Sequence, residues 1–70
     1  MIRIYKNGES HLFQKDEYFF DVKKSQLKII QLNLFFFLTE GDRKSLLIGE
    51  SVLCIDFKLR QHWNIKLEEN

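Results

Sequence analysis

Few side chains in this 70-residue sequence are of the types that carry out metal, nucleophilic or acid–base chemistry. The chain has two histidines, His11 and His62, and one cysteine, Cys54. None of them has the CxxC or HxxxH spacing that places metal ligands side by side. Ser10 and His11 are neighbours, but neighbours in a strand point to opposite faces and form no nucleophile–base pair. The sequence therefore predicts neither a metal site nor a cofactor.

The acidic residues and the glycines add no catalytic pattern. Asp16 and Glu17 are adjacent in a polar segment, which is typical of solvated loop charges rather than of two carboxyls converging on a pocket. The three glycines are isolated turn residues, so the chain has no phosphate-binding loop. Cys54 lies in an apolar segment without a neighbouring base, where an inert buried thiol is expected. We therefore expect a protein that is not an enzyme.

One group of cations deserves comparison with nucleic-acid binders. Lys58, Arg60 and Lys66 share one strand parity, so they could form a row on a sheet face. Such a row can follow a phosphate backbone, as small barrels do on single strands. The nearby aromatics Phe57 and Trp63 fall on the opposite parity, away from that row. A solvated face is the favoured interpretation, and nucleic-acid binding is the alternative.

Length and composition indicate a single small domain, residues 1–70, that needs help to be stable. A chain of this size buries only about 60% of its unfolded surface. Disulfides, metals and oligomerisation are the usual remedies, and one cysteine excludes a disulfide within the chain. Self-association as a dimer is the remedy that remains. The formal net charge of +1 does not indicate a dedicated polyanion binder.

The apolar segments are too short for targeting or for the membrane. The N-terminus has no long apolar run with a small-residue cleavage site, so no signal peptide is expected. The most apolar run, Ile29–Leu38, is far shorter than the roughly 18–20 residues of a membrane span. A lone cysteine fits a reducing cytoplasm, and we expect a cytoplasmic protein without a membrane partner. Heavy use of Phe, Ile, Asn and Lys indicates an AT-rich genome, such as a low-GC bacterium or its phage.

The elements that must position these residues are predicted to be strands. The chain has no alanine and no proline, and it is rich in phenylalanine, isoleucine and leucine, which favours strand over helix. Asn7-Gly8 is a strong signal for a type I′ hairpin turn. Alternation of apolar and polar residues predicts strands in three segments, 2–6, 18–22 and 52–67. A turn is expected within the last segment, around Arg60–His62. The end of the chain, Glu68–Asn70, is expected to be frayed. The sequence predicts an all-β fold of about five to seven short antiparallel strands in a small barrel or sandwich, with little or no helix.

The run Ile29–Leu38 is predicted to be the centre of this fold. Its alternation shifts phase at Ile30, which indicates a bulge in a strand, while a helix over 26–38 is the competing interpretation. Gly41-Asp42 has the form of a two-residue hairpin turn, which would pair the run with the segment from residue 44 to residue 57.

That pairing fixes a register, and the register predicts two faces. The even positions Ile30 to Leu38 would be core, with Ile30 opposite Leu53. The other face would gather an apolar patch of Phe35, Phe37, Leu46 and Ile48. A second copy or another partner would cover this patch, unless the strand twists and the patch is simply core.

These observations lead to three functional hypotheses. The first is a non-enzymatic binding protein, such as a phage-encoded regulator or inhibitor, that self-associates through strand faces or edges and contacts another macromolecule. The second is a small nucleic-acid-binding barrel that uses Lys58, Arg60 and Lys66. The third is a small-molecule binder with a pocket between protomers.

Overall fold

A computed structural model describes residues 1–21 and 23–68, so predictions on Val22 and on the end at 69–70 lie outside the described residues. Within them the chain forms seven strands: β1 (Ile2–Lys6), β2 (Glu9–Phe13), β3 (Tyr18–Asp21), β4 (Gln26–Ile29), β5 (Leu34–Phe37), β6 (Val52–Ile55) and β7 (His62–Leu67). A 3-10 turn, η1 (Lys15–Glu17), precedes β3, and one helix, α1 (Glu40–Leu47), connects β5 to β6. The predicted all-β class is confirmed.

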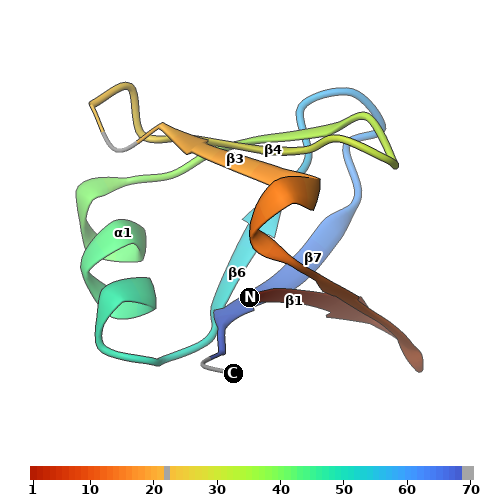
Figure 1. The fold of residues 1–70 in the computed structure, drawn as a ribbon, viewed down its shortest axis with the longest axis horizontal. Helices are drawn as coiled ribbons and strands as arrows, with labels where there is room; N and C mark the ends of the chain where they lie inside the picture. Colours follow the sequence, from red (N-terminus) through yellow and green to blue (C-terminus); the bar gives the residue numbers. More distant parts are fainter. Residues whose placement is uncertain (22, 69–70) are drawn as a thin grey trace.

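The strands form two antiparallel sheets that enclose the core. The four-stranded sheet has the order β2-β1-β7-β6, and the three-stranded sheet has the order β3-β4-β5. Figure 1 shows the two sheets as separate layers, with α1 covering one side between them. A single bridge, Phe36 to Asp56, and a hydrogen bond from the Phe57 N–H to the Phe35 carbonyl (2.7 Å) join β5 to the end of β6. The fold is therefore a sandwich that is closed along one seam.

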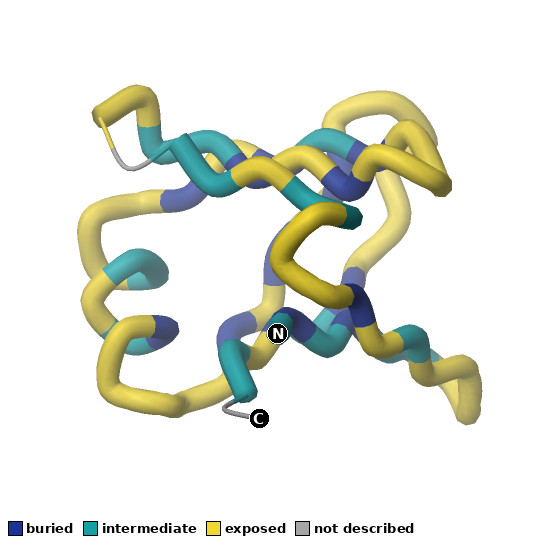
Figure 2. The backbone as a smooth tube through the Cα atoms, viewed as in Figure 1, coloured by how far each residue is buried: buried dark blue, intermediate teal, exposed yellow. Residues whose placement is uncertain are grey.

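The core lies between the inward faces of the two sheets, as the distribution of buried positions in Figure 2 shows. Alternate residues of the strands supply it, as expected for sheets with one face toward the interior. The fully buried side chains include Ile2, Ile4, Leu27, Ile29, Phe36 and Ile65.

The first hairpin is confirmed as predicted. Asn7 and Gly8 have positive φ angles of 42° and 85°, as both central residues of a type I′ turn require. The turn pairs Lys6 with Glu9 and Ile4 with His11.

The hairpin predicted at Gly41-Asp42 is wrong, because these residues form the first turn of α1. Thr39 is the N-cap, and its Oγ1 accepts a hydrogen bond from the Asp42 N–H (3.0 Å). The Asp42 carboxylate in turn accepts from the Thr39 N–H (3.2 Å). This reciprocal pair is a capping box with Asp in the third helical position, and it satisfies two backbone donors that a helix start would otherwise leave free.

The single bulged strand predicted over Ile29–Leu38 is also wrong. β4 ends at Ile29, residues 30–33 form a turn with Asn33 at φ 50°, and β5 returns to pair with β4. The phase shift in the sequence marks that turn. Ile30 and Leu32 are therefore exposed, whereas only Leu34, Phe36 and Leu38 of the even positions are core.

The C-terminal segment turns earlier than predicted. The turn covers residues 57–59 and is followed by Arg60 at φ 61°, before β7 begins at His62. In β6 the inward residues are Val52 and Cys54, and the expected core position Leu53 faces outward. Both faces of β6 are apolar, so alternation alone could not tell which of them is inside.

Candidate interaction surfaces

The four residues of the predicted patch do not form one surface. Leu46 is completely buried as the core contact of α1, and Ile48 is exposed at the C-cap of that helix. Phe35 and Phe37 do point outward from β5, and their ring centroids lie 5.1 Å apart. The correction follows from the helix, because residues 44–48 do not pair with β5.

Phe35 and Phe37 belong instead to a larger aromatic surface. The pairing of β3, β4 and β5 places Phe19, Lys28 and Phe35 in one row across the outward face of their sheet. Phe37 packs edge-on against Phe57 beyond the seam, with centroids 5.4 Å apart. Phe19, Phe37 and Phe57 are 62%, 52% and 61% exposed. We call Phe19, Phe35, Phe37 and Phe57 the phenylalanine face.

A buried carboxylate fixes the turn that carries Phe57. Asp56 has no exposed surface, and it accepts hydrogen bonds from the backbone N–H groups of Leu59 and Gln61 and from the Trp63 indole. Burial would raise the pKa of the Asp56 carboxyl, but these hydrogen bonds together lower it below the ordinary aspartate value. Asp56 therefore holds the turn in place as a charged, fully hydrogen-bonded group.

The predicted basic row is not a row. Lys58 and Arg60 lie in the connection between β6 and β7, whereas Lys66 lies on β7 opposite Arg3, on the outward face of the four-stranded sheet. Arg60 instead lines a small hollow of about 220 Å³ with Phe37, Ile55, Asp56 and Phe57. The structure thus brings a cation next to aromatic rings, which strand parity had excluded. Lys28 and Phe19 were missed, although the triplet Tyr18–Phe20 implies that one aromatic ring faces outward.

A second candidate surface is the free edge of β6. This strand pairs with β7 along one side only and ends the four-stranded sheet. Among the described residues, no backbone hydrogen bond outside the ladders of the sheets involves Val52–Ile55. Leu53 and Ile55 are 61% and 48% exposed, and the strand sequence V-L-C-I contains no charge.

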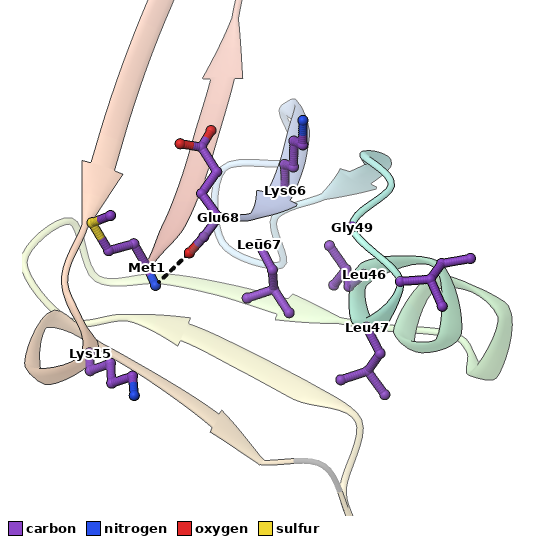
Figure 3. Close-up of a pocket in the computed structure, with 9 residues that line it drawn as sticks. Met1, Lys15, Leu46, Leu47, Gly49, Lys66, Leu67 and Glu68 are labelled. Atoms are coloured by element: carbon purple, nitrogen blue, oxygen red, sulfur yellow. Dashed lines mark hydrogen bonds between the residues drawn. The ribbon is translucent and has the colours of Figure 1, made fainter. Parts of the chain in front are cut away.

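A hollow of about 810 Å³ opens between the end of α1 and the end of β7. Figure 3 shows Met1 and Lys15 on one side of it and Leu46 and Leu47 on the other, with Leu67 between them.

The acid on the lining of this hollow is already engaged. The Glu68 carboxylate accepts a 2.6 Å hydrogen bond from Arg3 Nε. That bond raises the pKa of Arg3 and lowers the pKa of Glu68. The N-terminal ammonium donates to the Glu68 carbonyl oxygen (2.9 Å). The described lining therefore brings no free acid and base together for catalysis.

The remaining residues of chemical interest have local partners. The His11 ring lies near those of Phe13 and Trp63, with centroids 6.2 Å and 6.4 Å away. Cys54 is buried, and burial, with a smaller contribution from Asp42, raises the pKa of its thiol to about 11. Across residues 1–21 and 23–68, no three His, Cys, Asp or Glu side chains gather as a possible metal site.

Comparisons with known proteins give no family, relative or fold neighbour: no family model, no curated protein and no solved structure matches this chain. In the part of the chain that the structure describes, no helix has the length and apolar character needed to cross a membrane.

Proposed function

We propose that this protein is a non-enzymatic binding protein that self-associates as a dimer through β6 and acts by contacting another macromolecule. The observation that supports this proposal is the bare edge of β6, with Leu53 and Ile55 exposed beside it.

Edge strands of soluble proteins are normally protected against pairing with other chains. The usual devices are charged side chains, prolines, bulges or a covering loop. β6 carries no charge and no proline. β5 and α1 lie close to it, but β5 is joined to its end through only one ladder bridge, at Asp56. A second copy that pairs along this edge would satisfy the free backbone groups and extend the four-stranded sheet across the dimer.

The exposed side chains of β6 would contribute to the same contact. A two-fold dimer uses the same patch on both copies, so Leu53 and Ile55 of one protomer would lie beside those of its partner. Cross-strand side-chain contacts of this kind contribute roughly 0.2–1 kcal/mol per pair, in addition to the new backbone hydrogen bonds and before the entropy of association. This stabilisation is relevant because a chain of this length has only marginal folding stability as a monomer.

The test is size-exclusion chromatography with light scattering on the wild type, Leu53→Lys and the control Leu47→Lys. Leu47 is as exposed as Leu53 but lies at the end of α1. We expect a dimer for the wild type and for Leu47→Lys, and a folded monomer for Leu53→Lys by circular dichroism. A wild type that stays monomeric at high micromolar concentration contradicts the proposal.

A further inference from the structure

We propose that the phenylalanine face binds single-stranded nucleic acid. This inference goes beyond the proposed dimer, because the four rings lie on the three-stranded sheet and at its seam, although the hollow beside Phe37 and Phe57 is also lined by Ile55 of β6. It rests on two observations: outward-facing rings on the two outer strands of the three-stranded sheet and just beyond the seam, and cations beside them that have no ion-pair partner among the described residues.

The rings are arranged as a stacking platform. Phe19 and Phe35 occupy one cross-strand row on either side of Lys28, two strand spacings of about 4.8 Å apart. Phe37 and Phe57 continue the surface across the seam in edge-to-face contact. A sheet face with two or more exposed aromatic rings is how several small folds stack successive bases, and any base can stack because each has a π-face.

Cations outnumber acids on and around the rings, as a phosphate backbone requires. Lys28 lies between two rings, and Arg60 lines the hollow beside Phe37 and Phe57. Lys58 lies in the same connection between β6 and β7 as Arg60. Among the described residues, none of these three cations has an ion-pair partner.

Two acids of the described chain lie at this surface. Asp56 is buried and accepts three hydrogen bonds. Asp21 occupies the same outward row as Gln26 and Phe37 and accepts a hydrogen bond from the Lys24 N–H (3.1 Å), so, of the residues that the structure describes, it is the one acid that faces out among the rings. Lys23 and Lys24 follow Asp21 in the same turn and add two more cations at that end. The chain as a whole has a net charge of only +1, so this surface is more basic than the average of the molecule.

This combination favours a single strand over the other occupants of an aromatic face. A second copy docked on the same face would bring its cations against those of the first, which costs free energy. Duplex DNA hides its bases in the stack, so the exposed rings would find no partner there. A single strand offers both the negative backbone and the unstacked bases.

The experiment measures fluorescence anisotropy of a labelled oligo-deoxythymidine and a labelled oligouridine, with a duplex of equal length and heparin as competitors. We expect binding of the single strands that weakens with added salt, because cations on the protein release counterions from the strand. We expect Phe19→Ser, Phe37→Ser and Phe57→Ser each to weaken it about five-fold or more, the usual effect of losing one base–aromatic stack. Lys28→Gln should reduce the salt dependence.

Matched variants test whether the effects are specific to this face. Leu47→Ser removes a similarly exposed apolar side chain from α1, and Lys15→Gln removes a cation from η1. Both should bind like the wild type. The inference is overturned if neither oligonucleotide binds, if the three phenylalanine variants bind as tightly as the wild type, or if heparin and duplex compete as well as unlabelled single strand.

Light scattering on the same samples separates this inference from the dimer. A wild-type dimer that binds no oligonucleotide overturns the inference and leaves the proposed function standing. A wild-type monomer that binds single strands through these phenylalanines overturns the proposed dimer and supports this inference.

Discussion

The Trp63 indole donates its Nε1–H to the Asp56 carboxylate across 3.1 Å, and both side chains are buried. Asp56 accepts further hydrogen bonds from the backbone of Leu59 and Gln61, so it connects the core tryptophan to the turn that carries Phe57, Lys58 and Arg60. Lys6 Nζ lies over the same indole ring, 4.3 Å from its centroid. The position of Phe57 and of the cations beside it thus depends on one buried carboxylate.

Asp56→Asn should lower the free energy of unfolding by about 1–3 kcal/mol, measured by urea denaturation at pH 7. The amide keeps one acceptor oxygen but replaces the other with a donor, which leaves a buried backbone or indole N–H without its partner. Asp16→Asn, at an exposed position in η1, should change stability by no more than about 0.5 kcal/mol. Equal effects of the two substitutions would contradict the role assigned to Asp56.

The same carboxylate predicts a pH dependence. Its hydrogen bonds outweigh burial and lower the pKa of Asp56 in the folded state. The folded protein therefore holds this proton less tightly than the unfolded chain does. The resulting stability is present above the unfolded pKa of about 3.9 and is lost as pH falls through the lowered pKa.

The pKa of Glu68 is also lowered in the folded state, so its carboxyl adds to the same pH dependence. The contribution of Asp56 to stability is therefore measured as the difference in unfolding free energy between wild type and Asp56→Asn. That difference should shrink as pH falls below about 4. A difference that stays constant from neutral pH down through this range would contradict the assignment.

The neighbours Leu46 and Leu47 should respond differently to truncation. Leu46 is fully buried and docks α1 on the core, so Leu46→Ala should cost about 2–5 kcal/mol of stability. Leu47 is exposed, and Leu47→Ala should stay within about 0.5 kcal/mol of the wild type. Thermal or urea unfolding compares the pair. Similar losses at both positions would mean that α1 is not seated as described.

The Cys54 thiol should be unreactive in the folded protein. Its burial and its pKa of about 11 leave little thiolate at pH 8, and thiolate is the nucleophile in alkylation. Iodoacetamide should therefore modify the native protein much more slowly than the urea-unfolded chain, as followed by mass spectrometry. Native alkylation at the rate of a free cysteine peptide would contradict this expectation.

Alternation predicted the strand content and the first hairpin because both depend on local chemistry. Asn7 and Gly8 tolerate positive φ wherever they occur, so their turn could be identified without the rest of the fold. At residues 39–42, two local signals compete. Gly41-Asp42 suits a hairpin, but the Thr39–Asp42 capping box starts a helix that buries Leu46. Packing of that leucine decides the outcome, and packing is not local.

The candidate surfaces were partly missed for a related reason. Alternation gives the period of a strand but not which face is inside, and β6 is apolar on both faces. From the sequence, Leu53 and Ile55 are as good core candidates as Val52 and Cys54. Only the packing of α1 and the second sheet shows that Val52 and Cys54 are the buried pair. In the same way, the outward row that joins Phe19 to Lys28 and Phe35 exists only because three strands pair in one register.

Amide hydrogen exchange of β6 tests the central claim, pairing of two copies along this edge, most directly. In the part of the chain that the structure describes, the Val52–Ile55 amides that point away from β7 have no backbone hydrogen-bond partner in the monomer. We predict that their exchange slows as protein concentration rises through the dimer range, and that Leu53→Lys abolishes this slowing while β1 and β7 exchange as in the wild type. Exchange of these amides at the same fast rate at every concentration would contradict the account.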